Sequence, residues 1–175
     1  MTYRPNVLGL DLSITATGIA YPDGTLDTLR PQTAGDHRLD EIANAVGDAA
    51  EDTDIVAIEG PVSNVRSPGT NVILGMVHGA VRRELIRRGV AYAIVPPTVL
   101  KKFATGRGNA TKADMRVALI KRADIDERDD NRVDAWWLRA AALDAYNTPL
   151  VDMPKTNRDA LNSVEWPSLP DREAA

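Results

Sequence analysis

Apolar residues in the first third of the chain come in short runs separated by turn signals. The run at Val7–Leu12 is typical of a buried strand, and Pro22-Asp23-Gly24 is a strong turn signal. An antiparallel meander is therefore predicted, with strands at Val7–Leu12, Thr17–Tyr21 and Thr25–Leu29.

The later part of the chain alternates between helical spacing and short apolar runs. Apolar residues recur on one side of Asp36–Ala50, as in a helix. The run Ile55–Ile58 is typical of a buried parallel strand that ends at Glu59. Another strand is predicted at Val90–Val95, and further helices at Thr70–Arg88, Pro96–Phe103, Asn109 or Thr111 to Arg122, and Asp129–Tyr146. Three antiparallel strands followed by alternating helices and strands predict an α/β fold with a mixed sheet.

The pattern changes after Tyr146, where prolines interrupt a stretch with little periodicity. The length of 175 residues suits one domain with a full hydrophobic core. We expect residues 1–146 to form that domain and residues 147–175 to form a tail that wraps it. The tail should contain a helical turn near Asn157–Val164, and its last residues should be disordered.

The composition is that of an ordinary globular protein, with 43% apolar and 26% charged residues. No apolar run approaches the ~20 residues that span a bilayer, and the start lacks the apolar core of a signal peptide. The chain has no cysteine, which excludes disulfides and cysteine-ligated metal sites. These features predict a cytoplasmic protein, in the host bacterium if a phage encodes it, without a membrane partner.

Charge is segregated along the chain although the net charge is only −4. The segment 60–123 holds 12 Lys and Arg against 2 Asp and Glu, which leaves 9 basic and 23 acidic residues elsewhere. Such a basic centre can form a phosphate-binding face. Solvated helix faces explain the charge pattern equally well.

Four acidic residues stand out by their positions. Asp11 and Glu59 end two apolar strands, and Asp130 and Asp134 share one face of a helix. A buried carboxylate is costly unless a cation or hydrogen bonds compensate it. Converging hard oxygen ligands suit Mg²⁺ or Mn²⁺, and two such ions can hydrolyse a phosphodiester. Each acid alone has a structural alternative as a turn residue, an ion-pair partner or a first-turn helix acid.

The stretch PPTVLKKFATGRGNATKADM adds basic groups. Its glycines at 106 and 108 allow the backbone to approach a phosphate. Lys112 lies near a predicted helix start, where a cation opposes the helix dipole, so a helix-stabilising role explains it poorly. Lys101 and Lys102 can bind phosphate too, although a solvated helix face accounts for either of them.

Together these segments resemble the RuvC family of Holliday junction resolvases, in the RNase H-like superfamily. The resemblance rests on LGLDLSITATGIA, VAIEGP, TVLKKFATGRGNATKADM and NRVDAWWLRAAA, in that order, and covers about Val7 to Tyr146. Small phage-type members are the most similar. It implies a five-stranded RNase H-like mixed sheet flanked by helices and a homodimer that binds four-way DNA junctions.

The resemblance also implies roles for individual residues. Asp11, Glu59 and Asp134 match the metal-binding acids, Lys112 matches a lysine important for cleavage, and Lys101 matches a basic DNA contact. Where the family usually has a fourth acid the chain has Asn131. We predict that Asp130 is the fourth ligand, with Asn131 as the neutral alternative.

A second departure lies after Glu59, where the family often has an aromatic residue that can stack on a base. Here the stretch reads GPVSNVR, so Val62 or Arg66 is expected to wedge or stack instead. Lys102, Arg107 and Arg66 complete the predicted DNA contacts. Gly75 and Gly79 lie four apart on a predicted helix and favour a two-fold interface, or else close packing on the sheet.

The predicted function is a crossover junction endodeoxyribonuclease, a metal-dependent enzyme that nicks branched DNA symmetrically with two Mg²⁺ ions per site, or Mn²⁺ as a substitute. One alternative is a nuclease for flaps, forks or RNA–DNA hybrids. Another is a noncatalytic DNA-binding protein with the same fold. An actin-like ATPase shares the opening motif but needs two domains, so no nucleotide cofactor is expected.

Overall fold

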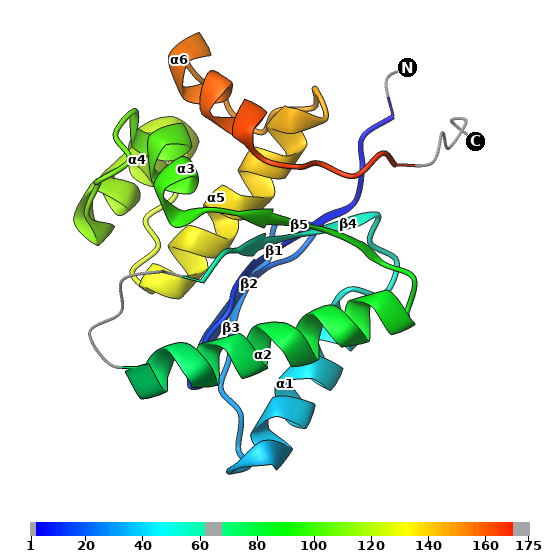
Figure 1. Cartoon of the computed structure of the whole chain (residues 1–175). Helices are drawn as coiled ribbons and strands as arrows, with labels where there is room; N and C mark the ends of the chain where they lie inside the picture. The colour runs from blue at the N-terminus through cyan, green and yellow to red at the C-terminus, as the bar shows by residue number, and fades with distance from the viewer. Residues whose placement is uncertain (1–2, 62–67, 170–175) are drawn as a thin grey trace.

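The computed structural model describes residues 3–61 and 68–169 of the chain. Within them one mixed sheet has the strand order β3-β2-β1-β4-β5 (Figure 1). β1 to β3 are antiparallel neighbours, whereas β4 and β5 run parallel to β1. The strands are β1 Val7–Asp11, β2 Thr17–Ala20, β3 Leu26–Leu29, β4 Ile55–Glu59 and β5 Ala91–Val95. The predicted five-stranded mixed sheet of the RNase H-like type is confirmed.

Helices cover both faces of the sheet. One face carries α1 (Asp36–Ala49) and α2 (Pro68–Arg87), and the other carries α3 (Pro97–Thr105), α4 (Lys112–Ala123) and α5 (Asp130–Ala145) (Figure 1). The predicted helices are confirmed to within a few residues.

The helix ends show why the predicted boundaries were off by a residue or two. α3 continues to Thr105 because Gly106, with φ 84°, adopts the left-handed conformation that ends it. α4 begins after Thr111, whose side chain forms a reciprocal capping box with Asp114, so Thr111 rather than Asn109 is the cap. Asp129 caps α5 and accepts a hydrogen bond from the Asn131 backbone N–H.

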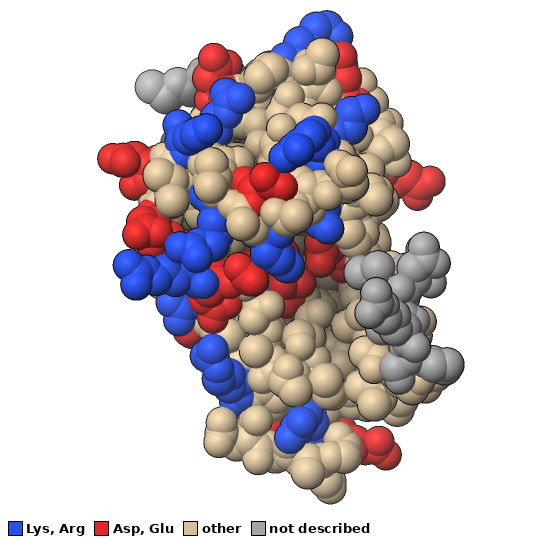
Figure 2. Space-filling view, turned by 90° about the vertical axis from the view of Figure 1, so that its left-hand side faces the viewer, with Lys and Arg blue, Asp and Glu red and all other residues tan. Residues whose placement is uncertain are grey.

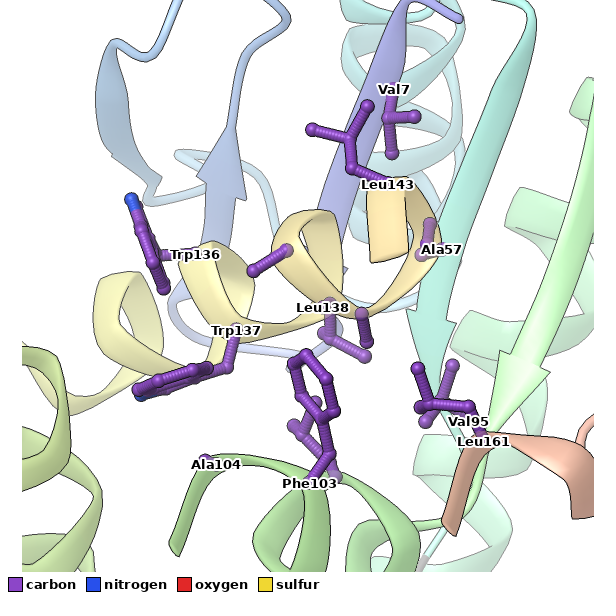
Figure 3. Close-up of a cluster of buried hydrophobic side chains, with 14 of the residues drawn as sticks. Val7, Ala57, Val95, Phe103, Ala104, Trp136, Trp137, Leu138, Leu143 and Leu161 are labelled. Carbon is purple, nitrogen blue, oxygen red and sulfur yellow. The ribbon is translucent and has the colours of Figure 1, made fainter. Parts of the chain in front are cut away.

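Two hydrophobic clusters hold the layers together, one on each face of the sheet. Leu8 and Leu10 of β1 pack against α1 and α2, whereas Val7 belongs to the cluster under α5. Figure 3 shows that second cluster, in which Phe103 of α3 points toward α5. The ring centroids of Phe103 and Trp137 lie 5.9 Å apart in an edge arrangement. α5 is therefore the central element of this face.

Two glycines allow α5 to lie directly on the sheet. A Cβ on Gly9 of β1 would lie 2.1 Å from the Ala135 carbonyl oxygen, and one on Gly18 of β2 would lie 2.1 Å from that of Asn131. Gly18 and Gly9 are thus both positions of close packing against the α5 backbone. The contact fixes the first turns of α5 beside the carboxyl end of β1.

The segment after α5 runs back over the α5 side of the molecule. It contains α6 (Lys155–Arg158) and a 3₁₀ turn, η1 (Asp159–Ser163), where a helical turn was predicted. Met153, Leu161 and Val164 join the cluster under α5. Among the described residues, none of the helices has the length and apolar character needed to span a membrane.

Candidate metal centre

Three acids that are far apart in the sequence meet at one end of the sheet. Asp11 ends β1, Glu59 ends the neighbouring parallel strand β4, and Asp134 lies in the second turn of α5. Each offers a carboxylate oxygen, and these oxygens lie within 4.8 Å of one another. Parallel strands end at the same edge, and the glycine contacts bring α5 against that edge. The predicted convergence of Asp11, Glu59 and Asp134 is thus present in the fold.

The cluster is electrostatically unfavourable without a bound cation. Burial raises the pKa of Asp11 well above its usual range, and the charges of Glu59 and Asp134 raise it further. Burial and then the charge of Asp134 raise the pKa of Glu59 to about 7. Burial also raises the pKa of Asp134, against the opposing charge of Lys112. Three crowded carboxylates resist ionisation together, and a divalent cation would relieve that repulsion.

Lys112 is the basic group in direct contact with the cluster. Its ammonium nitrogen forms an ion pair with Oδ2 of Asp134, whose side chain is only 4% exposed, while about half of the lysine side chain remains exposed. Burial lowers the Lys112 pKa, but Asp134 and the two other acids raise it overall. Lys112 therefore stays protonated with its charge at the mouth of the site.

Asp134 retains one oxygen with no partner. Oδ1 is buried and accepts no hydrogen bond from any described residue. Such an orphaned carboxylate oxygen is unfavourable unless a cation binds it. Together the carboxylates of Asp11, Glu59 and Asp134 form a hard donor set that suits Mg²⁺ or Mn²⁺ and offers no soft ligand.

The hydroxyl residues after Asp11 serve the loop itself. Thr17 is fully buried and donates a 2.9 Å hydrogen bond to the Ser13 carbonyl oxygen. Thr17 Oγ1 also accepts a bond from the Ser13 backbone N–H, and Ser13 Oγ accepts bonds from the N–H groups of Thr15 and Ala16. These bonds make the loop between β1 and β2 a rigid support for Asp11.

The two candidates for the fourth ligand, Asp130 and Asn131, differ in their exposure to solvent. Asp130 is exposed at the start of α5 and is absent from the group of three converging acids. Its charge nevertheless raises the Asp134 pKa, although less than burial does. Asn131 is half-buried, and its backbone carbonyl faces Gly18. The fourth ligand stays a prediction.

The predicted DNA-contacting residues differ in how close they lie to the three acids. Lys101 of α3 lies close enough that its charge lowers the pKa of Glu59 and Asp134. Lys102 is exposed on the same helix. Arg107 is exposed and pairs with Asp114 at 3.0 Å. Arg66, like Val62, lies outside the described residues.

Figure 2 shows basic and acidic side chains side by side across the middle of one face of the molecule.

Sequence reasoning missed two features that hold α5 against the sheet beside the acid cluster. One is Gly9, which a glycine inside a buried strand could have signalled as a close backbone approach. The other is the Arg132 side chain, which donates to Thr28 on β3 and helps hold the start of α5.

Comparison with known proteins finds curated relatives but no matching family model. The chain is 32% identical over 118 residues to "Crossover junction endodeoxyribonuclease RuvC" of Salinibacter ruber, an alignment that covers 61% of this chain and 65% of that protein. It is 27% identical over 136 residues to the protein of the same name from Rhodopirellula baltica, covering 68% and 76%. The chain thus spans just under two thirds of the first relative.

Solved structures share the fold at lower identity. "T. thermophilus RuvC in complex with Holliday junction substrate" matches with a TM-score of 0.67 and 21% identity over 86% of this chain and 99% of that one. "Thermus thermophilus RuvC structure" matches with a TM-score of 0.63 and 20% identity, covering 85% and 99%. The resemblance inferred from the sequence motifs is confirmed by the sequence relatives and by the fold.

Proposed function

We propose that this chain, which its relatives and its fold associate with the RuvC family, is a metal-dependent endonuclease that cleaves branched DNA. The observation that carries the proposal is the meeting of Asp11, Glu59 and Asp134 beside Lys112. A noncatalytic DNA-binding protein would have no use for three carboxylates crowded against their own repulsion. The name of the relatives, crossover junction endodeoxyribonuclease, favours four-way junctions as the substrate over flaps, forks or RNA–DNA hybrids.

The three acids would hold two Mg²⁺ ions, or Mn²⁺ as a substitute, with Asp11 as the ligand shared between them. When bound, such ions activate a water and stabilise the leaving 3′ oxygen of a phosphodiester. Asp134 would contribute its orphaned Oδ1. Asp130, or Asn131 in its place, would complete the set from the first turn of α5.

The basic residues of the proposal position the DNA. Lys112, half-exposed beside Asp134, would place its ammonium against the scissile phosphate and stabilise charge that develops there. Lys101, Lys102 and Arg107 would contact phosphates along the strand, and Arg66, which lies outside the described residues, stays a predicted DNA contact. These contacts fix the register of the DNA without reading its sequence.

We further infer a homodimer, which would place two such sites across one junction and make the nicks symmetric. Support comes from α2, where Val72, Ile73 and Met76 are large apolar side chains left exposed. A Cβ on Gly75 or Gly79 would meet no atom of the described residues within 4 Å, so these glycines do not pack on the sheet. They would let a second copy of α2 approach closely.

Residues 1–146 would form the nuclease unit, and residues 147–175 would form a tail that wraps it. The protein would act in the cytoplasm, where its DNA substrate lies.

The test of the proposed function is Asp11→Asn, with Asp27→Asn on the exposed side of β3 as the matched control. The Asp11→Asn protein should still bind a labelled four-way junction but should fail to nick it with Mg²⁺ or Mn²⁺. The control should cut like the wild type. Cleavage by Asp11→Asn would remove Asp11 from the site.

The same cleavage assay, run on other DNA and RNA–DNA hybrid substrates, tests which substrate the protein prefers. Paired symmetric nicks in the junction support the dimeric resolvase. Cutting confined to flap or RNA–DNA hybrid substrates would instead favour a different structure-selective nuclease. Binding to DNA with no metal-dependent cutting of any substrate would favour the noncatalytic alternative.

A further inference from the structure

A second pocket lies away from the acids, toward the amino end of β1. It has a volume of about 410 Å³ and is lined by the segment before β1, the turn between β2 and β3, and the middle of α5. Arg4, Asp23 and Arg139 supply its charged groups, and Pro5, Pro22 and Leu150 are among its apolar walls. In Figure 1 this segment enters the sheet at the end opposite the start of α5.

Arg139 is the unusual residue of this pocket, because it is a buried cation that forms no ion pair with an acid in the described part of the chain. Arg139 is only 7% exposed to solvent. One guanidinium nitrogen donates to the Pro22 carbonyl oxygen. Nε is buried and has no hydrogen-bond partner among the described residues. Asp144, five residues further along α5, is paired with Arg158 at 2.7 Å.

The pocket adds a second cation, Arg4, whose effect on Arg139 exceeds that of the pocket's acid, Asp23. Burial lowers the pKa of Arg139, and the charge of Arg4 lowers it further. Asp23 acts in the opposite direction but more weakly, and its carboxylate accepts a 2.8 Å hydrogen bond from the Thr25 backbone N–H. A purely structural brace for the Pro22 turn would explain the bond to the carbonyl but not the convergence of two arginines.

We propose that the pocket between Arg4 and Arg139 binds a phosphate-type oxyanion. Guanidinium groups present several donors in a plane that matches phosphate oxygens. The anion would accept hydrogen bonds from the Arg139 guanidinium and would neutralise both arginines. Free phosphate and a backbone phosphate of DNA share this chemistry. The site is separate from the acid cluster and does not depend on the proposed nuclease activity.

The experiment measures thermal unfolding of the full chain in sodium phosphate and in sodium chloride of equal ionic strength. Phosphate should raise the midpoint in proportion to the logarithm of its concentration above Kd, by about 5 °C at roughly 100 times its Kd. Arg139→Met keeps most of the side-chain stem and should lose the response. Arg4→Gln changes an exposed residue, keeps the fold and should weaken the response even if Arg139→Met does not fold.

Two further variants locate the response. Lys121→Gln removes one exposed cation from α4 and should respond like the wild type. Lys112→Met removes the cation beside the acid cluster, where the phosphate would bind if the pocket did not bind it. Equal midpoints of the wild type in both salts would overturn the proposal. So would a response that survives in Arg4→Gln and Arg139→Met, or one that disappears in Lys112→Met alone.

A second arm identifies the source of the phosphate. Binding of a short duplex DNA is measured against salt concentration for the wild type and Arg4→Gln. A shallower salt dependence in Arg4→Gln, together with a weakened phosphate response, assigns the pocket to the DNA backbone. An unchanged dependence with a weakened phosphate response assigns it to the free anion.

Discussion

Helix α5 carries three buried charged residues, of which Asp134 and Arg139 have opposite sign and lie five residues apart, whereas Asp144 is paired with Arg158. Asp134 is 3% exposed and Arg139 is 7% exposed, and each leaves one buried atom without a hydrogen-bond partner in the described part of the chain. Asp134 lies among other acids with Lys112 at its side, whereas Arg139 lies beside another arginine. A buried charge is costly unless an opposite charge compensates it. The two residues would thus belong to proposed sites for ligands of opposite sign, a cation and an anion.

One contact holds both sites in place. A Cβ on Gly9 would lie 2.1 Å from the Ala135 carbonyl oxygen and 2.8 Å from the Arg139 backbone nitrogen. The helix can therefore approach β1 between the two charged residues only because position 9 has no side chain. The acid cluster depends in addition on Gly18, which admits the first turn of α5 onto β2.

The largest expected effect comes from removing the charge of the acidic site. Asp134→Asn keeps the shape of the side chain but loses a ligand charge, so cleavage of a four-way junction should fall at least about 100-fold. Loss of an outer partner of a metal ligand already costs 10–100-fold. Single-turnover cleavage with Mg²⁺ and calorimetric Mn²⁺ binding measure the loss.

Asp130→Asn is the matched comparison on the same helix face. If Asp130 is the fourth ligand, this variant should also bind Mn²⁺ more weakly, although its exposed position predicts a smaller loss than for Asp134. Unchanged metal affinity in Asp130→Asn would transfer the fourth position to Asn131. Unchanged cleavage in Asp134→Asn would contradict the proposed centre itself.

The next effect tests the contact that α5 makes with the sheet. Gly9→Ala forces a Cβ into backbone atoms, so it should destabilise the fold by about 3 kcal/mol or more, at the upper end of overpacking costs. Both metal binding and the phosphate response should weaken, because both charged residues shift with the helix. Denaturant unfolding measures the stability change.

Gly69→Ala, in the exposed first turn of α2 where a Cβ meets nothing within 4 Å, is the control and should be neutral or slightly stabilising. A Gly9→Ala protein as stable as the control would show that α5 does not need this close approach.

The smallest effect is a pH dependence that separates the acid cluster from the arginine pocket. The folded chain holds the pKa of Glu59 at about 7, above its usual value near 4.5, and raises those of Asp11 and Asp134. The folded state then binds more protons than the unfolded state. Without metal, stability should therefore fall as the pH rises from about 4.5 to about 7.

Mn²⁺ should reverse that trend, because it binds the ionised carboxylates and its affinity increases with pH over the same range. Thermal unfolding in chelator and in Mn²⁺ across this range provides the measurement. Glu59→Gln should flatten both curves. A wild-type stability in chelator that rises through this range would contradict the raised pKa values.

Much of the fold was predictable because local patterns carry it. Short apolar runs with turn signals predicted β1 to β5, and Thr111 with Asp114 formed the capping box that starts α4. Asp11, Glu59 and Asp134 were recognisable as acids at the ends of apolar strands or on a helix face. Boundaries were less predictable, because α3 ends only where Gly106 turns left-handed.

The arginine pocket was not predictable. The pocket is formed by Arg4, the Pro22 turn and Arg139, which lie far apart in the chain. From sequence alone, an arginine on a helix is ordinarily interpreted as a solvated side chain. Nothing in the local pattern indicated that Arg139 would be buried.

By itself the sequence determined the order of strands and helices, the acids at strand ends, the basic centre and the resemblance to the RuvC family. Local hydrophobic periodicity and residue chemistry are sufficient for these. Only the tertiary structure decided which charges meet. The approach of α5 onto Gly9 and Gly18 placed Asp134 beside Asp11 and Glu59, left Asp130 exposed and buried Arg139 near Arg4. The reason is that the cost of a buried charge depends on its neighbours in space, which the packing of the helix on the sheet sets.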